Sequence, residues 1–482
     1  MTVTLNSLAD FTLANLKRVA WQGEDLRFGS QALALMRQRR AEFLAFIEAN
    51  PDRPVYGVTS GFGDRAAVML TPEERARQAT MPPLLTAAGV GPALPTRVVR
   101  AMILGRLINF VSGYAAVSLE TAEGVAAMLD GRPLPTVRIA GQDSPGELLA
   151  LFNLFHDFMG PMSQLRDQNA LRNGAACAPG LLGDMALRAG NRARLATRVF
   201  ALSIDAGNMG LDPYDPALKP LLDDPLEADV IDRLQALLAG VSMEGRRDYQ
   251  APISWRILTR LLGQMLRVVE EVESTARQLL TTVNDNPVFL GPEQAPPIGR
   301  CITTGGFHVP RAYHAMNWQT QIWADLAAVA AREVEQLHRH KVTGLPDRLW
   351  VGESRYSTVF LGMTANDLAA RAQDAAKPAL IPLYGGNDGQ TDTAMPLFRA
   401  YEREGEAARL LDLILAILAA SASQALAVAG RDAAPQLRPF LKTIRTAFPV
   451  VESARDLGAE VERLAAAFDA TVTEQPGGVA MA

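Results

Sequence analysis

Apolar residues recur along this chain at spacings of three and four positions, with polar residues between them. An amphipathic helix has this period, whereas a half-buried strand alternates at every second position. Leu, Ala, Arg, Glu and Gln, which favour helices, are abundant throughout. The pattern therefore predicts a mainly α fold with a bundle of long helices, over residues 256–280, 317–341, 404–430 and 451–468.

One helix start is predicted in detail by the stretch "TPEERARQA". Thr71 is expected to cap the helix, and Pro72 suits the first turn because that position needs no backbone N–H. Glu74 is expected to complete a capping box with Thr71.

Four turn-rich stretches interrupt the helical pattern, and each is dense in Gly, Pro, Asn or Asp. They are expected to form irregular loops on a rigid helical scaffold, where functional residues are often found. Their ranges are 51–64, 131–147, 284–310 and 382–396. We expect an N-terminal region of helices and loops over 1–200, and the long-helix bundle with the C-terminal helices over 201–482.

The most apolar stretch, residues 410–430, is long enough to span a membrane. Asp412, two serines and Gln424 interrupt it, and its alanine content matches the neighbouring helices. A helix that is apolar on all sides also belongs in the middle of a bundle. We therefore expect a buried helix here.

Composition excludes several classes of function. The chain has 482 residues and a net charge of −5, and no basic stripe suggests nucleic acid or an anionic membrane as a partner. Its two cysteines lie far apart, which argues against a disulfide framework or a structural zinc site. With no recognisable export signal, the expected location is the cytoplasm. A small-molecule partner fits this composition best.

The stretch "VYGVTSGFGD", residues 55–64, combines a tyrosine with closely spaced glycines. It resembles the tyrosine loop of the aromatic amino-acid ammonia-lyases, which include the histidine and phenylalanine ammonia-lyases. Further segments resemble that family in the same order along the chain, from about residue 30 to 430: "AAGVGPALPTRVVRAMILGRLINFVSGY", "RPLPTVRIAGQDSPGELLAL", "RNGAACAPG", "QAPISWR", "NDNPVF", "GGFHVP" and "GQTDTAM".

The resemblance implies a mainly helical fold, and usually a homotetramer whose active sites each draw residues from more than one subunit. It also implies a reaction, the removal of ammonia from an α-amino acid to leave an α,β-unsaturated acid. The family performs this reaction with an electrophile built from its own chain, methylidene-imidazolone, which forms from Ala-Ser-Gly.

The aligned stretch in this chain is Asp143-Ser144-Pro145-Gly146. Ring formation requires the backbone N–H of the third residue to attack the carbonyl of the first. Ser144 could still be dehydrated, but Pro145 has no backbone N–H, so the ring cannot close with Ser144 in the middle. We therefore expect no cofactor in this protein, although a true ammonia-lyase with an unusual cofactor is kept as an alternative.

The same turn also has a structural interpretation. Ser144 at the N-cap, Pro145 at the first helical position and Glu147 at the third would form a capping box that starts an α-helix. Such a helix end could still bind part of a carboxylate through its unpaired N–H groups.

Other positions of the resemblance differ in the same direction. Groups that serve the electrophile or the amine in the family are replaced here, in an alignment good to about one residue. The residues found in their place are Pro179 for an asparagine, Ile253 for a second tyrosine, Thr391 for a glutamate and Thr86 for a histidine. Several such changes suggest an altered function.

The tyrosine of the loop is retained as Tyr56, and Gly63 lies in the same loop. In the family this tyrosine removes the β-proton, so Tyr56 is the candidate acid or base and Gly63 a candidate substrate contact. An ordinary phenol has a pKa near 10 and needs help to act as a base at neutral pH. The alternative is a tyrosine that is only hydrogen-bonded within a glycine-rich loop.

Four further positions match the family's substrate pocket. Arg256 is the candidate anchor for a substrate carboxylate because paired guanidinium donors match two oxygens, and Gln250 is expected beside it. Arg256 could instead pair with a structural carboxylate. Asn286 and Phe307 also match pocket positions, although an Asn-Pro turn and a buried aromatic ring are equally ordinary features.

New charged groups near the altered turn could replace the lost chemistry, since a cleft can shift the pKa of a carboxylate toward neutrality. They could equally be solvated loop residues. They are Asp143, which is also a candidate substrate contact, with Arg138, Glu147 and Asp392.

Among the histidines, His308 is a candidate pocket residue, and His314 on the following helix could simply pack. His338 and His340 stand two positions apart on a helix and so face different sides, which makes metal binding there unexpected.

Two further readings of the function remain open beside the unusual ammonia-lyase. The first is an enzyme without methylidene-imidazolone that catalyses an elimination, addition, isomerisation or cyclisation on a small amino-acid-derived carboxylate. In this reading Tyr56 is the acid or base, Ser144 is a further candidate catalytic residue and Arg256 is the anchor. The second is a catalytically silent homologue that binds a small acid or another chain. Retention of both Tyr56 and Arg256 favours the enzyme, because a scaffold needs neither.

Overall fold

The computed structural model describes residues 2–81, 88–247, 250–351, 353 and 355–474, with side chains described up to residue 470. The chain forms two compact units. Unit 1 comprises Met1–Leu187, Val272–Met316 and Pro378–Glu402, and unit 2 comprises Arg188–Glu271, Asn317–Lys377 and Arg403–Ala482. Each unit therefore combines three separate stretches, whereas the regions expected from the sequence are contiguous.

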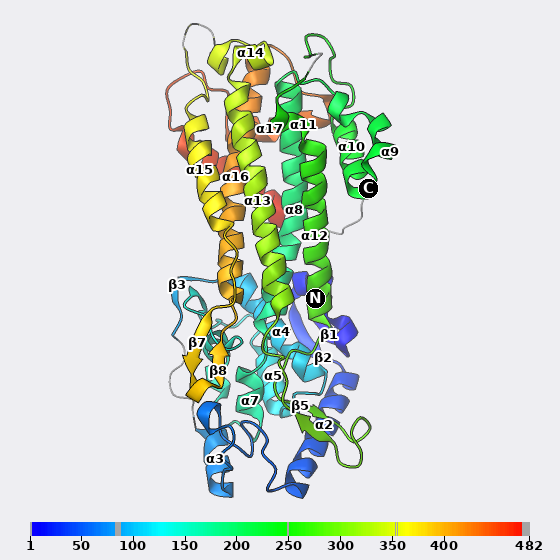
Figure 1. Cartoon of the computed structure of the whole chain (residues 1–482), viewed down its shortest axis with the longest axis vertical. Coiled ribbons are helices and arrows are strands. Elements are labelled where there is room, and N and C mark those ends of the chain that lie inside the picture. The colour runs from blue at the N-terminus through cyan, green and yellow to red at the C-terminus, as the bar shows by residue number, and fades with distance from the viewer. Residues whose placement is uncertain (1, 82–87, 248–249, 352, 354, 475–482) are drawn as a thin grey trace. The chain divides into compact units, whose positions relative to one another are not determined.

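Unit 2 is helical, and its long helices lie side by side (Figure 1). The longest are α8 (Cys177–Ala206), α12 (Leu258–Leu280), α13 (Pro310–Leu337) and α16 (Leu397–Val428), each with its first or last turns in unit 1. The others are α9 (Lys219–Leu222), α10 (Pro225–Leu237), α11 (Ile253–Arg256), α14 (His340–Thr343), α15 (Leu361–Ala375), α17 (Arg438–Ala447) and α18 (Leu457–Glu474).

The predicted mainly α fold and its long helices are confirmed, with shifted ends. Helix α13 begins seven residues before the predicted 317–341, because Pro310 is tolerated in a first turn. It ends at Leu337, and the extended Arg339 separates it from α14. Short polar connections of this kind are hard to place from apolar periodicity alone.

Helix α16 contains the most apolar stretch of the chain. Within the described part of the chain it is the one helix long and apolar enough to cross a bilayer, and 78% of its most apolar window is buried. Packing against its neighbours accounts for this composition, so the expected buried helix is confirmed.

A buried carboxylate joins three long helices inside unit 2. The side chain of Glu404 on α16 is fully buried and accepts hydrogen bonds from Gln319 Nε2 at 2.9 Å and Trp323 Nε1 at 3.0 Å, both on α13. Arg188 of α8 lies 3.4 Å from its other oxygen. A buried charge is tolerated only when it is paired and hydrogen-bonded, so these contacts fix the helices relative to one another.

We predict that Glu404→Ala lowers the free energy of unfolding by about 3–5 kcal/mol, because three buried donors lose their acceptor. Glu406→Ala is the matched control on the same helix. Glu406 is exposed and pairs with Arg409, so its loss should cost less than about 1 kcal/mol. Chemical denaturation of both variants measures the difference, and equal midpoints would contradict the assigned role of Glu404.

Unit 1 mixes helices with short strand pairs (Figure 1). Strands β1 (Thr2–Leu5) and β2 (Asp25–Phe28) pair in parallel. Three antiparallel pairs follow, β3 (Val90–Ala93) with β4 (Arg138–Ala140), β5 (Val288–Leu290) with β6 (Arg300–Ile302), and β7 (Leu383–Gly386) with β8 (Thr391–Thr393). The helices are α1 (Leu13–Leu16), α2 (Ser30–Ala49), α3 (Pro72–Thr80), α4 (Thr96–Val111), α5 (Leu119–Ala127), α6 (Leu148–Phe155) and α7 (Asp167–Arg172).

The loops predicted from Gly, Pro, Asn and Asp are found, and three of them contain the short strands β4 to β8. Three- or four-residue strands carry too little periodic pattern to be recognised in a sequence. The predicted start of α3 is confirmed. Thr71 accepts a hydrogen bond from the Glu74 N–H, the Glu74 carboxylate accepts one from the Thr71 N–H, and Pro72 is the first helical residue.

Candidate functional site

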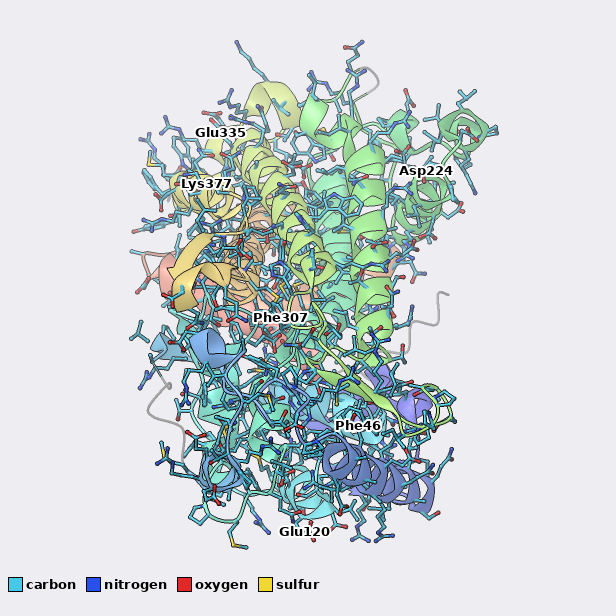
Figure 2. The ribbon with its side chains drawn as sticks, turned by 60° about the horizontal axis from the view of Figure 1, so that its bottom comes forward. Phe46, Glu120, Asp224, Phe307, Glu335 and Lys377 are labelled. Atoms are coloured by element: carbon cyan, nitrogen blue, oxygen red, sulfur yellow. The ribbon has the colours of Figure 1, made fainter. Side chains whose placement is uncertain are left out.

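Tyr56 lies in a glycine-rich loop anchored by a buried apolar cluster of unit 1. Val55 and Val58 are 3% and 1% exposed and belong to the same cluster as Phe46, which is labelled in Figure 2. Between them Gly57 has a φ of +70°, a left-handed conformation that glycine adopts at little cost. The two buried valines therefore anchor the loop, and Tyr56, which follows Val55, is half-buried.

The tyrosine side chain is held by its own loop. The Gly63 N–H donates to the Tyr56 hydroxyl at 3.3 Å, and the Asn169 amide donates to the Tyr56 backbone carbonyl at 3.1 Å. The Phe62 ring meets the Tyr56 ring edge-on, with ring centroids 5.6 Å apart. The hydroxyl is thus hydrogen-bonded within the loop, as the structural alternative expected, and it also faces a cavity.

This cavity has a volume of about 550 Å³ and lies entirely within unit 1. Among the described residues that line it, Asp392 is the one carboxylate, and no lysine or arginine takes part. Polar side chains dominate the wall. The lining residues are Pro54, Tyr56, Ser60, Gly63, Ala66, Pro145, Leu148, Asn173, Asn286, Thr303, Thr304, Phe307, Asn387, Gln390, Thr391, Asp392 and Thr393.

The structure brings five sequence-predicted candidates together in this cavity, namely Tyr56, Gly63, Asn286, Phe307 and Asp392 (Phe307 is labelled in Figure 2). The Asn286 side-chain oxygen accepts a hydrogen bond from the Thr304 N–H at 2.7 Å, which ties two loops together. Its amide donor is left for another partner, because a side-chain amide has both an acceptor and donors.

The altered turn also reaches the cavity, through Pro145 and not through Ser144. Ser144 is 5% exposed, its hydroxyl donates to the Gly146 carbonyl at 3.3 Å, and its carbonyl accepts from the Met395 N–H at 2.9 Å. Gly146 has a φ of +71°, and a Cβ there would come within 3.0 Å of the Phe307 carbonyl. The turn is therefore packed tightly against the backbone of Phe307, a residue that lines the cavity.

The capping box predicted at Ser144-Pro145-Gly146-Glu147 is wrong. Helix α6 begins at Leu148, and the left-handed Gly146 breaks the helical path that a cap at Ser144 requires. Glu147 instead caps a different helix, because its carboxylate accepts the N–H groups of Cys177 and Ala178 at the start of α8, the latter at 2.8 Å. A glycine at the second helical position was the sequence signal against the box.

Burial dominates the chemistry of Glu147, which is 1% exposed. Desolvation raises the pKa of Glu147 to about 7, against the opposing effect of the hydrogen bonds from Cys177 and Ala178 and of the Arg106 charge. Burial likewise raises the pKa of the Cys177 thiol well above its usual range. Glu147 therefore changes its charge near neutral pH. It does not line the cavity.

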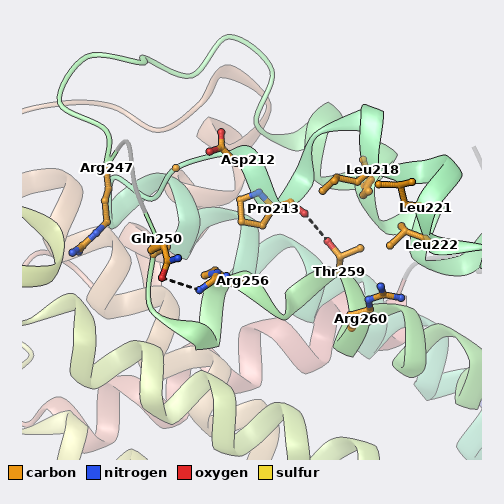
Figure 3. A pocket seen from close by; sticks show the side chains of 13 residues that line it. Asp212, Pro213, Leu218, Leu221, Leu222, Arg247, Gln250, Arg256, Thr259 and Arg260 are labelled. Carbon is orange, nitrogen blue, oxygen red and sulfur yellow. Dashed lines mark hydrogen bonds between the residues drawn. The ribbon is translucent and has the colours of Figure 1, made fainter.

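Two further predicted substrate residues lie in unit 2. Gln250 and Arg256 line a separate pocket of about 510 Å³ within unit 2 (Figure 3). Arg256 Nη1 lies 3.5 Å from Gln250 Oε1, and Arg256 forms no ion pair with a described carboxylate. The structural salt bridge considered as an alternative is therefore absent from the described residues, and both side chains are exposed.

The other charged candidates are distributed differently. Asp143 does not line the cavity and pairs with Arg399 at 2.9 Å, and exposed Arg138 donates to the Gly91 carbonyl at 2.8 Å. Asp392 does line the cavity and is exposed. Asp392 is thus the candidate among them that can meet a bound molecule.

The histidines contact protein groups. His308 does not line the cavity, and its ring nitrogen lies 3.4 Å from the Tyr313 hydroxyl, while burial lowers the pKa of His308. His314 packs against the Tyr313 ring. His338 contacts the Val334 carbonyl. Over the ranges that the structure describes, no group of three His, Cys, Asp or Glu side chains is placed to hold a metal ion.

The positions at which the resemblance implied the loss of a functional side chain also lie in different parts of the structure. Thr391 lines the cavity, whereas Pro179 lies in the first turn of α8 and does not line it. Ile253 is 70% exposed in unit 2, beside Arg256. Thr86 lies outside the described residues.

Several polar cavity residues were not named as candidates from the sequence, among them Asn173, Asn387 and Gln390. Asn173 stands in "RNGAACAPG", the same stretch in which an asparagine was expected to be lost at Pro179. The Asn-Gly pair was the available signal, since Gly174 has a φ of +84° and ends α7 in a turn that leaves Asn173 in the wall. Asn387 and Gln390 belong to the turn between β7 and β8. Gln390 stands in the quoted stretch "GQTDTAM", whereas Asn387 precedes it and carries no motif.

These features define a mainly helical protein with a cavity lined largely by loop residues, in which polar side chains are placed to orient a small molecule. The family model described as "Aromatic amino acid lyase" matches residues 11–163 and 161–446, so the chain belongs to the aromatic amino acid lyase family. The family resemblance of the sequence is therefore confirmed.

Individual relatives are distant. The histidine ammonia-lyase of Burkholderia vietnamiensis is 24% identical over 468 residues, which cover 90% of each chain. Ergothionase from Treponema denticola, an ergothioneine-degrading enzyme, has a TM-score of 0.88 at 16% identity, covering 98% of this chain and 100% of its own. A tyrosine aminomutase from Streptomyces globisporus has a TM-score of 0.85 at 21% identity, covering 98% of both. The structural likenesses establish the fold.

We predict that Glu147 makes the protein more stable in mild acid. The folded state keeps the Glu147 proton up to about pH 7, whereas the unfolded chain loses it near the usual glutamate pKa. The unfolded state therefore binds fewer protons between these values, and the free energy of unfolding falls as pH rises, by up to about 3 kcal/mol.

Glu147→Gln should flatten this dependence between about pH 5 and pH 8, as measured by denaturant titration at each pH. The control Glu120→Gln, at an exposed position labelled in Figure 2, should leave the slope unchanged. A Glu147→Gln variant with the wild-type slope would show that Glu147 is not the responsible group.

Proposed function

We propose that this protein is a lyase of the aromatic amino acid lyase family that acts without methylidene-imidazolone. It would catalyse an elimination, or the related addition, isomerisation or cyclisation, on a small amino-acid-derived carboxylate. The observation that carries the proposal is Pro145, which lines the same cavity as Tyr56 at the place where the resemblance implies the electrophile.

The residues of the turn do not fit the prosthetic group in either possible register. With Ser144 in the middle, Pro145 would have to supply a backbone N–H that proline lacks. With Pro145 in the middle, the Gly146 N–H is available, but proline has no hydroxyl to lose as water. Each register therefore lacks one atom group that ring formation needs, and we derive no step through this group.

Without an internal electrophile, the leaving group has to depart unaided. A quaternary ammonium group keeps its positive charge at every pH and leaves as a neutral amine, so it meets this need better than a primary amine. One enzyme with a similar fold degrades ergothioneine, whereas the other relatives are named after common amino acids. This supports a substrate range for the fold that is wider than those amino acids.

In the proposed elimination Tyr56 acts in its ionised form. Its oxygen takes the proton from the β-carbon, the C–H electron pair becomes the Cα=Cβ double bond, and the electron pair of the Cα–N bond leaves with the amine. Asn286 and Phe307 line the cavity beside Tyr56, where an amide donor and an aromatic face can orient the substrate. Ser144 has no direct role, because its hydroxyl is used inside the turn.

We further propose that Arg256 reaches the substrate from another subunit of a homotetramer. No described cation lines the Tyr56 cavity, although a carboxylate substrate needs one. Arg256 has no carboxylate partner among the described residues, and exposed apolar side chains stand beside it, with Ile253 70% and Ile257 37% exposed. Such a surface is suited to being covered by another chain.

We predict that Tyr56→Phe lowers the rate of elimination by about 10²–10⁴-fold, because the variant keeps the ring and loses the proton acceptor. The assay offers matched pairs of substrates, each an α-amino acid and its N,N,N-trimethyl betaine with an imidazole, phenyl or hydroxyphenyl side chain. The betaine of at least one pair should react, and its amino acid should not.

Tyr114→Phe is the control for this variant, because Tyr114 lies in unit 1 outside the cavity and its hydroxyl accepts a hydrogen bond from Gln294. Full activity in Tyr56→Phe would refute the assignment of the base. Binding of these acids without turnover in the wild type would identify a silent binding homologue instead.

We predict that two inactive variants complement each other when their subunits are mixed. Each variant chain carries one defect, so a Tyr56→Phe chain still has a wild-type Arg256 and an Arg256→Met chain still has a wild-type Tyr56. In a mixed tetramer, a site is intact wherever a wild-type Tyr56 of one chain meets a wild-type Arg256 of another. Mixing after mild dissociation should restore roughly a quarter of the wild-type rate, as expected for random pairing of equal amounts. If both groups served a site from one subunit, mixing would restore nothing.

A further inference from the structure

Arg172, the last residue of α7, lies against the aromatic pair of the tyrosine loop. Its guanidinium carbon is 3.2 Å from the centroid of the Phe62 ring, and that ring meets the Tyr56 ring edge-on. The Phe152 ring lies on another side, 5.8 Å from the same carbon. The next residue, Asn173, lines the cavity. The cation therefore contacts the ring that packs against Tyr56.

This guanidinium is half-buried and lacks the carboxylate partner that a cation in such a place normally has. Its Nη2 is buried and has no hydrogen-bond partner, and Arg172 forms no ion pair with any carboxylate among the described residues. Arg166 on the same side of unit 1 is different, since its Nε and Nη2 donate to the carbonyls of Ala115 and Pro287. An unpaired buried charge is costly, so its presence requires a compensating interaction.

The electrostatics identify one opposite charge that acts on this group. Burial lowers the pKa of Arg172 to about 10, and the negative charge of an ionised Tyr56 acts in the opposite direction. Arg172 thus stays positively charged at neutral pH, and the phenolate form of Tyr56 is the anion within its reach.

We propose that Arg172 is a positioning residue that stabilises the negative charge on the Tyr56 oxygen when Tyr56 acts as the base. The proposal rests on the function proposed above. A fixed cation in a partly desolvated place favours an anion beside it, and it needs no rearrangement when the charge forms. When the β-proton reaches Tyr56 the phenol becomes neutral, and Arg172 itself neither gains nor loses a proton.

Other charged groups near the loop are weaker candidates for this role. Asp392 of β8 lines the same cavity and has the wrong sign. Asp64 and Arg65 belong to the 3₁₀ turn Gly63–Arg65 and are exposed, and Arg65 lies 3.8 Å from Glu74. Solvent screens such exposed charges, which leaves the half-buried Arg172 as the cation on which the charge of Tyr56 acts.

The test measures the ionisation of Tyr56 directly and needs no substrate. Ultraviolet difference titration of the full-length protein, with Tyr56→Phe subtracted, records tyrosinate formation at this position. Arg172→Met should move the titration midpoint upward by about one pH unit or more, and Arg172→Lys, which keeps a cation, should retain most of the wild-type midpoint. Phe62→Leu should move it upward too, because the guanidinium loses the ring that holds it.

Arg172→Met and Phe62→Leu should also shift the rising limb of the pH profile of kcat/KM to higher pH, whereas the control Arg65→Met should leave titration and profile unchanged. Midpoints that agree in wild type, Arg172→Met and Phe62→Leu would overturn the inference. If Arg172→Met does not fold, Phe62→Leu and Arg172→Lys decide the matter by the same titration. An active Tyr56→Phe variant would refute the proposed function alone, since the titration still reports whether Arg172 acts on Tyr56.

Discussion

The carboxylate of Glu147 joins the altered turn to the first N–H groups of α8, and the candidate site depends on this contact. Helix N-termini stabilise anions, so the contact compensates part of the cost of burying a carboxylate. It places Glu147 beneath the turn, where Gly146 takes a left-handed conformation against the Phe307 backbone. With both of these positions fixed, Pro145 is the residue of the turn that reaches the cavity.

That arrangement limits the chemistry available to the cavity. A proline in the wall offers neither a reactive N–H nor a hydroxyl, and the described polar groups around it are amides, hydroxyls, one phenol and one carboxylate. Such a set can move a proton and orient a polar substrate, but it has no strong electrophile of its own. The proposed function follows from this set together with membership of the aromatic amino acid lyase family. The half-buried Arg172, which contacts the Phe62 ring beside the phenol, fits the same account, because it would provide charge stabilisation from outside the cavity.

The sequence was sufficient to predict the parts of the fold that depend on local pattern. The long helices follow from apolar spacing, the start of α3 from its capping residues, and the placement of Tyr56, Asn286 and Phe307 in one cavity from motifs in family order. Features that depend on packing between distant segments could not be predicted. Glu147 stood at the right position for a capping box at its own helix, yet the N–H groups that it binds lie thirty and thirty-one residues later. Arg172 begins the quoted stretch "RNGAACAPG", but nothing in that stretch indicates its contacts with the rings of Phe62 and Phe152, which come from distant segments.

The absence of an internal electrophile is the central claim, and the mass of the intact chain tests it most directly. Purified protein that turns over a substrate should be weighed by high-resolution mass spectrometry, together with a proteolytic peptide that spans residues 138–152. The account predicts the mass of the unmodified sequence for both, with Ser144, Pro145 and Gly146 intact. A deficit of two water molecules that maps to this peptide would show that the ring forms after all and would contradict the account.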